Sequence, residues 1–147
     1  DRMRFDLTVN EFTKTLYEKK TLLVYDPYTW RPYCHVKDFS QIIIKIIGSD
    51  PMIFKNQIFN CGDNKNNYSK MKLVKTLKKF FPNGKIEFNY KKTKDLRNYK
   101  VNFKKLKKKL NVKIKYDIHY GIKEIINHLK RKNYKKPRGN FGNYLIK

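Results

Sequence analysis

Cysteine is scarce in this chain, and long apolar runs are missing. The two cysteines, Cys34 and Cys61, do not have the spacing of metal ligands, so neither a disulfide framework nor a zinc site is predicted. The longest apolar run, residues 42–47, includes Lys45 and is far shorter than the roughly 20 residues that cross a membrane. These absences predict a soluble domain in a reducing cytoplasm, with no metal and no membrane contact.

Acidic residues are also few: the 147 residues include 12 Asp and Glu and 36 Lys and Arg. A net charge of +24 is compatible with a nucleic-acid partner, an anionic membrane surface or a phosphorylated ligand. The chain is also rich in Lys, Asn, Ile and Tyr and contains no alanine, a bias that codon composition alone can produce. Charge by itself therefore does not choose a partner.

The first fifty residues alternate between helix and strand patterns. Asp6 is expected to cap a helix that runs to about Lys20, and short strands are expected at residues 22–25 and 31–36. Asp38 with Gln41 matches a capping box, and the isoleucine-rich helix that follows is expected to be buried on most sides. The chain begins at Asp1 without methionine, which we interpret as a truncated or excised domain.

The second half continues the alternation. Strands are expected at residues 57–62 and 85–90, where apolar and polar positions are bounded by turns. Three helices are expected: one capped by Ser69, a short one carrying Leu106 and Leu110, and one capped by Asp117. The sum is a mixed α/β fold with short strands and four or five helices over residues 1–129, followed by a basic, flexible tail at 130–147.

Four segments carry a specific resemblance. They are Arg2-Met3-Arg4-Phe5-Asp6 with Val9-Asn10, then Trp30 to Asp38, then Phe59-Asn60-Cys61-Gly62, and finally Asp95 to Val101 with Phe103 and Lys105. In this order they resemble the C-terminal half of extended short-chain dehydrogenase/reductases, the NAD-dependent epimerase/dehydratase family that acts on nucleotide sugars. The resemblance implies the substrate-binding half of such an enzyme, without its Rossmann half.

The resemblance also implies which residues bind substrate. Arg31 and Arg97 are expected to clamp the pyrophosphate of a nucleotide sugar, because guanidinium groups offer two parallel hydrogen bonds to such an anion. Asn10 corresponds to an amide near the substrate phosphates, and Tyr25 to a segment along the nucleotide base. The turn after Tyr25 departs from the family's commoner Tyr-Gly-Asp-Gly, which leaves base and sugar specificity open.

The family's cofactor and catalytic groups are missing from these residues. A glycine-rich dinucleotide loop is absent, since Gly139-Asn140-Phe141-Gly142 lacks a preceding strand and a following helix. Tyr68 and Lys72 have the family's Tyr-x-x-x-Lys spacing but lie in the wrong segment, and His35 is interpreted as structural. No catalytic residue is therefore assigned, and NAD or NADP is expected only in the full-length enzyme and not on this chain alone.

The leading hypothesis is the substrate-binding half of an NAD(P)-dependent nucleotide-sugar epimerase, dehydratase or reductase, inactive without its Rossmann half. Its family forms homodimers in full-length form. The alternative is a small basic nucleic-acid-binding module, in which runs such as Lys107-Lys108-Lys109 follow phosphates and tyrosines stack on bases. Against the alternative, lysines recur on nearly every segment instead of clustering. The reaction, the sugar, the base and the choice of NAD or NADP stay open.

Overall fold

The strands form two separate pairs in a computed structural model that describes residues 4–90 and 97–131. β1 (Leu22–Tyr25) pairs in parallel with β4 (Ile86–Asn89), and β2 (Trp30–Pro32) pairs antiparallel with β3 (Asn67–Ser69). The expected strands at residues 22–25 and 85–90 are thus confirmed. Each described strand has a single neighbour, so the sheets are too small to organise the fold alone.

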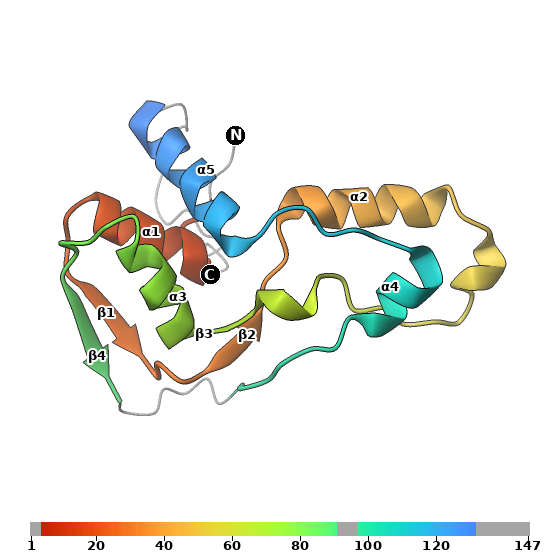
Figure 1. The fold of residues 1–147 in the computed structure, drawn as a ribbon, viewed down its shortest axis with the longest axis horizontal. Coiled ribbons are helices and arrows are strands. Elements are labelled where there is room, and N and C mark those ends of the chain that lie inside the picture. The colour runs from red at the N-terminus through yellow and green to blue at the C-terminus, as the bar shows by residue number, and fades with distance from the viewer. Residues whose placement is uncertain (1–3, 91–96, 132–147) are drawn as a thin grey trace, which may run out of the picture.

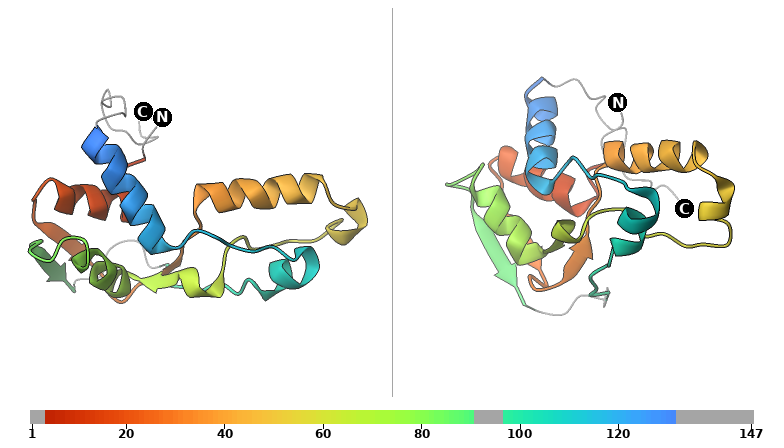
Figure 2. Two further views of the ribbon diagram at one scale, coloured as in Figure 1. Left: turned by 45° about the horizontal axis from the view of Figure 1, so that its top comes forward. Right: turned by 45° about the vertical axis from the view of Figure 1, so that its right-hand side comes forward.

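Within the described residues, five α-helices and two short 3₁₀ helices surround these strand pairs, which confirms the predicted mixed α/β class. They are α1 (Thr8–Tyr17), α2 (Val36–Ile47), η1 (Pro51–Ile53), η2 (Asn64–Asn66), α3 (Lys70–Lys78), α4 (Lys104–Leu110) and α5 (Ile118–Arg131). Figure 1 shows α1, α3 and α5 gathered beside β1 and β4, while α2, η1 and α4 extend away from them as an arm. The views in Figure 2 show the same division. None of the helices in the described ranges is long and apolar enough to cross a bilayer.

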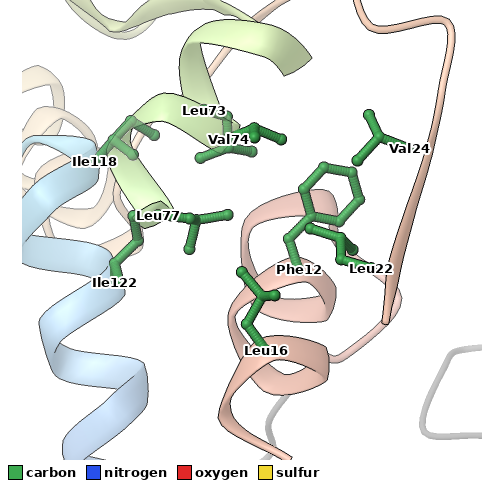
Figure 3. Packing of buried hydrophobic residues seen from close by; sticks show 9 residues of the cluster. All are labelled: Phe12, Leu16, Leu22, Val24, Leu73, Val74, Leu77, Ile118 and Ile122. Carbon is green, nitrogen blue, oxygen red and sulfur yellow. The ribbon is translucent and has the colours of Figure 1, made fainter. Parts of the chain in front are cut away.

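The main core lies between α1, α3, α5 and the β1 strand. Phe12 of α1 lies beside Leu22 of β1, whereas Leu16 points toward Leu77 of α3, which lies between α1 and α5 (Figure 3). Ile122 of α5 completes the contact from the other side and is fully buried. The apolar residues of each helix recur at three- and four-residue spacing, which places them on one face.

A second, smaller core holds the arm together. Ile42 of α2 packs with Leu106 and Leu110 of α4, and all three are almost fully buried. Asp38, in the first turn of α2, is also buried, and its carboxylate accepts the backbone N–H groups of Lys115 at 3.0 Å and Tyr116 at 2.9 Å. This carboxylate joins α2 to the chain that returns from α4 to α5.

Several predicted details were wrong. Asp6 does not cap α1, because its carboxylate pairs with Arg4 instead. Asp38 does not cap α2 either, because His35 is the N-cap residue. The Asp38 carboxylate instead binds the backbone of the segment between α4 and α5. The second strand ends at Pro32, and residues 57–62 do not form a strand. The expectation that α2 is buried on most sides also fails, since most of its isoleucines are exposed.

Other local signals were correct. The Ser69 hydroxyl accepts the backbone N–H of Lys72 and caps α3, and the Asp117 carboxylate accepts the backbone N–H of Tyr120 in the first turn of α5. The short helix with Leu106 and Leu110 is α4. α5 continues to Arg131, and residues 132–147, where a flexible tail was predicted, lie outside the described residues.

His35, Lys37 and Glu124 fasten the start of α2 to α5. His35 accepts the backbone N–H of Lys37 through Nδ1, so its Nε2 donates to Glu124 at 2.9 Å. Lys37 pairs with the other oxygen of Glu124 and lies 5.6 Å from the rings of both Tyr116 and Tyr120. Partial burial acts to raise the pKa of Glu124, but the hydrogen bonds from Lys37 and His35 prevail and hold it below its usual 4.5.

Replacement of Glu124 by Gln is expected to lower the free energy of unfolding at pH 7 by about 0.5 kcal/mol, a small effect because solvent screens the partly exposed pair. Since the folded-state pKa of Glu124 is depressed, its contribution is present above pH 4.5 and is lost as the pH falls through the folded value. Urea unfolding of both proteins at pH 7 and near pH 3 measures this. If the difference in the free energy of unfolding between the two proteins stayed constant in acid, the assigned ion pair would be contradicted. The control is Glu87→Gln, because Glu87 is an exposed residue of β4.

Candidate functional site

The candidate site is built on β2 and on residues 97–103, which run beside it. The backbone N–H of Trp30 donates to the Asn98 side-chain oxygen at 2.9 Å, and the Tyr99 N–H donates to the Trp30 carbonyl at 3.3 Å. β2 is bound to β3 on its other side through the register Arg31 opposite Tyr68. Arg31 therefore lies on a strand that is held from both sides.

The structure places the Arg31 guanidinium next to the backbone of Arg97, the second arginine that the resemblance assigned to the substrate pyrophosphate. The Arg31 guanidinium donates to the Trp30 carbonyl at 2.9 Å and to the Arg97 carbonyl, and it lies 5.4 Å from the centre of the Tyr99 ring. The Arg97 side chain is exposed. A guanidinium stacked on an aromatic ring and bound to carbonyls has a fixed plane, which suits the directional recognition of an anion.

Sequence reasoning missed the aromatic part of this arrangement. Lys100 Nζ lies 3.8 Å from the centre of the Trp30 ring, so the two segments exchange a pair of cation–π contacts: Arg31 with Tyr99 and Lys100 with Trp30. The signal was present as two dipeptides, Trp30-Arg31 and Tyr99-Lys100, that each join an aromatic residue to a cation. Their contact depends on a separation of about seventy residues along the chain, which no local pattern reveals.

Asparagine side chains hold residues 101–103 in place. Asn67, which is 9% exposed, donates to the Val101 carbonyl and accepts the Val101 N–H, both at 2.9 Å. The Asn64 side-chain oxygen accepts the Phe103 N–H at 3.0 Å. These bonds satisfy backbone groups that have no neighbouring strand, and they fix residues 97–103 against β2 and β3.

A cavity of about 280 Å³ opens where β2 ends. Its lining contains aromatic, apolar, thiol and amide side chains and no charged residue: Pro32, Tyr33, Cys34, Asn60, Cys61, Tyr99, Val101 and Phe103. Tyr99 is shared between this cavity and the Arg31 guanidinium. The cavity and Arg31 thus offer an uncharged surface next to a cation.

The thiols that line the cavity are not activated. Burial, with smaller contributions from Asp38 and Cys61, raises the pKa of Cys34 to about 11, and burial also raises the pKa of Cys61. Burial likewise raises the pKa of Tyr33, against the opposing effects of Thr8 and Arg31. All three groups are neutral at pH 7, so the cavity is suited to binding and not to nucleophilic or proton-transfer chemistry.

Asn10 and Tyr25, the other predicted substrate-binding residues, lie on different elements. Asn10 is on α1, where its amide donates to the Arg4 carbonyl at 2.9 Å. Tyr25 ends β1 with its ring 42% exposed, and its carbonyl accepts Lys70 Nζ at 2.7 Å. Arg31 is therefore the centre of the candidate site, with the Arg97 backbone beside it. The substrate-binding roles of Arg31, Arg97, Asn10 and Tyr25 all stay predictions.

Gly62 and the Tyr68–Lys72 pair, which the sequence singled out, both make contacts inside the described fold. Gly62 follows the strand-like residues 57–61 with φ of 147°, but a Cβ there would approach the Phe103 ring within 2.8 Å, so its missing side chain makes room for a ring and not for a phosphate. Tyr68 and Lys72, which have the family's Tyr-x-x-x-Lys spacing, form a cation–π contact, with Lys72 Nζ 4.0 Å from the centre of the Tyr68 ring. Within residues 4–90 and 97–131, no group of three or more His, Cys, Asp or Glu lies together where a metal could bind.

Comparison with solved structures identifies the fold. The UDP-glucuronic acid 4-epimerase of Bacillus cereus matches with a TM-score of 0.74 at 16% identity, and the match covers 89% of this chain and 42% of the epimerase. The UDP-glucose 4-epimerase of Thermotoga maritima matches over 87% and 40%, with a TM-score of 0.72 at 19% identity. The dTDP-glucose 4,6-dehydratase of Bacillus anthracis matches over 89% and 41%, with a TM-score of 0.71 at 19% identity. No known family model matches the sequence.

These matches define the class of fold as the C-terminal portion of an extended short-chain dehydrogenase/reductase, as the sequence predicted. The structural neighbours named above are nucleotide-sugar epimerases and a dehydratase, and two of them were solved with NAD. L-threonine dehydrogenases match as well, one from Cupriavidus necator with a TM-score of 0.66 at 6% identity. The chain spans about two fifths of the length of these solved structures.

Replacement of Asn67 by Ala is expected to release residues 97–103, because the Val101 N–H and carbonyl lose their described partner. A buried polar group left without a partner costs about 1–3 kcal/mol, and a loss of stability in that range is expected. Urea unfolding measures the loss, and hydrogen exchange at Val101 should quicken in parallel. Asn83→Ala, at an exposed turn, is the control, and equal stability of the two variants would contradict this role of Asn67.

Proposed function

We propose that this chain is the substrate-binding part of an NAD(P)-dependent nucleotide-sugar epimerase, dehydratase or reductase, and that Arg31 binds the pyrophosphate of the substrate. The observation that carries the proposal is the Arg31 guanidinium, which is held by two carbonyls and Tyr99 beside an uncharged cavity. A nucleotide sugar matches this arrangement, because it joins a charged diphosphate, suited to the guanidinium, to uncharged ring systems, suited to the cavity. Arg97, Asn10 and Tyr25 are proposed as further substrate contacts.

The cation at Arg31 is the feature that favours a nucleotide sugar over the other substrates of the fold. The solved structures with this fold include L-threonine dehydrogenases, so fold alone does not select the substrate. Charge-assisted hydrogen bonds from a guanidinium to phosphate oxygens are among the strongest available to a protein. The geometry around Arg31 orients its plane, and the neighbouring Tyr99 ring offers a surface on which an uncharged ring can stack.

In this proposal the chain binds and orients the substrate, and it does not carry out the reaction by itself. NAD(P) would supply hydride transfer when bound to the complementary, dinucleotide-binding part of the enzyme. In this proposal Arg31 holds the diphosphate, and burial keeps the Cys34 thiol and the Tyr33 hydroxyl of the cavity neutral. We therefore propose that the chain alone is inactive.

Replacement of Arg31 by Ala is expected to weaken the binding of UDP-glucose or dTDP-glucose to the full chain ten- to hundredfold, the effect of losing charged hydrogen bonds that together contribute about 1.5–3 kcal/mol. Calorimetric titration measures this. Lys55→Ala is the matched control, because it removes one positive charge from an exposed position on the arm.

Three results would contradict the proposal. Equal weakening by Arg31→Ala and Lys55→Ala would show that only net charge matters. Tighter binding of an unrelated oligonucleotide, fading with salt and unaffected by Arg31→Ala, would favour the alternative of a basic nucleic-acid-binding module. Binding of nucleotide sugars at unchanged affinity to Arg31→Ala would place the substrate elsewhere on the chain.

A further inference from the structure

The cavity at the end of β2 lies on the far side of Arg31 from the proposed contact for the nucleotide base. That contact, Tyr25, ends β1, and Figure 1 shows β2 running from the end of β1 toward the arm. Arg31 is the middle residue of β2, and the cavity begins at Pro32, the last residue of the strand. A nucleotide sugar that follows β2 with its base near Tyr25 and its diphosphate at Arg31 therefore places its sugar in the cavity.

The described lining of the cavity offers this sugar no positive charge. It consists of aromatic, apolar, thiol and amide side chains, with no lysine or arginine. Lys100 follows Tyr99 in the chain, but its Nζ is held 3.8 Å from the centre of the Trp30 ring and is not part of the lining. Arg31 is the neighbouring cation, and in the proposed function it binds the diphosphate. A negatively charged sugar would thus lack a counter-charge among the described lining residues.

Burial at the cavity also disfavours negative charge. It raises the pKa of the Cys34 thiol to about 11, with smaller contributions from Asp38 and Cys61, because a thiolate loses hydration that the neutral thiol does not need. Burial raises the pKa of Cys61 as well. A sugar carboxylate beside these thiols would lose hydration in the same way, and an unpaired charge is costly to remove from water. The diphosphate, which is also negative, would repel it further.

Asn60 supplies a polar contact that suits an uncharged sugar. It is an exposed residue of the cavity lining, and its Nδ2 donates to the Asn102 carbonyl at 3.3 Å. Within the described residues, the side-chain oxygen of Asn60 receives no hydrogen bond. An amide oxygen accepts hydrogen bonds, so it can bind a sugar hydroxyl, which donates, but it repels an ionised carboxylate, which only accepts.

We infer that the cavity selects nucleotide sugars whose sugar is uncharged, and that Asn60 is a specificity-determining residue that favours a neutral hexose over a uronic acid. This inference rests on the proposed function and names the class of sugar that the same site takes. Fold alone does not make this choice, because the solved structures that match include a UDP-glucose 4-epimerase and a UDP-glucuronic acid 4-epimerase. The uncharged lining beside Arg31 makes it.

Calorimetric titration of the full chain with UDP-glucose, UDP-glucuronic acid and UDP tests the inference. The two sugars differ at C6, where a hydroxymethyl group is replaced by a carboxylate, so their comparison isolates the charge. UDP-glucose should bind about tenfold or more tightly than UDP-glucuronic acid, because the carboxylate is desolvated without a partner. It should also bind more tightly than UDP, because the sugar gains contacts in the cavity. These titrations use the unmodified chain, so no variant has to fold.

Replacement of Asn60 by Lys places an ammonium group in the lining. It should improve the binding of UDP-glucuronic acid relative to UDP-glucose about tenfold, because the carboxylate gains a charged hydrogen-bond donor. Asn60 is exposed, so the longer side chain can reach solvent without entering a core. Asn83→Lys is the matched control, since it adds the same charge at the exposed turn between α3 and β4 and should leave the ratio of the two affinities unchanged.

Three results would overturn the inference. They are binding of UDP-glucuronic acid to the unmodified chain as tight as that of UDP-glucose, binding of UDP as tight as that of UDP-glucose, and a ratio of affinities that Asn60→Lys changes no more than Asn83→Lys does. In each case, weaker binding of these ligands to Arg31→Ala would leave the proposed function standing. Failure of all three ligands to bind the unmodified chain would remove the proposed function and this inference with it.

Discussion

Side-chain amides and carboxylates that bind backbone groups are the constraint on which this structure depends. Its strands occur in pairs, so much of the backbone has no neighbouring strand to satisfy it. Asn67 binds Val101 in both directions, and Asp38 accepts two N–H groups of the segment before α5. Together with the bonds from Trp30 to Asn98 and Tyr99, the first contact holds residues 97–103 beside β2, where the Arg97 carbonyl and the Tyr99 ring orient Arg31. The candidate site is thus a product of buried polar contacts more than of sheet or helix packing.

The strong positive charge is used locally. Several exposed lysines lie over aromatic rings, among them Lys37, Lys72 and Lys100, and Lys105 also donates to the Ile58 carbonyl. Cation–π contacts of this kind turn an unusual composition, rich in lysine and tyrosine, into many small stabilising interactions. They also explain how lysines can recur on nearly every segment without forming one basic stripe. Arg31 differs from these lysines because carbonyl groups and a ring together fix its orientation.

The sequence predicted the elements whose causes are local and missed those that depend on distant partners. Three predictions of this local kind are correct: the strand from the alternation at residues 85–90, the cap at Ser69, and the short helix from the spacing of Leu106 and Leu110. The caps assigned to Asp6 and Asp38 failed because each carboxylate binds a different partner, for Asp38 one that lies 77 residues away. The strand expected at residues 57–62 and the burial expected for α2 both failed within the arm, where α2 is packed on one face only, through Ile42 and Ile46. In the site, the resemblance singled out Arg31 and Arg97, whose role in substrate binding stays a prediction, whereas the contacts of Tyr99 and Asn67 required the tertiary structure.

A crystal structure of the chain soaked with UDP-glucose would test the central claim most directly, because it shows where the diphosphate lies. The account predicts diphosphate oxygens within hydrogen-bonding distance of the Arg31 guanidinium, with an uncharged ring of the ligand against Tyr99 and the cavity at the end of β2. Density for the diphosphate among the lysines of α4, with Arg31 still bound only to protein, would contradict it. In that event the orientation of Arg31 would serve the fold alone.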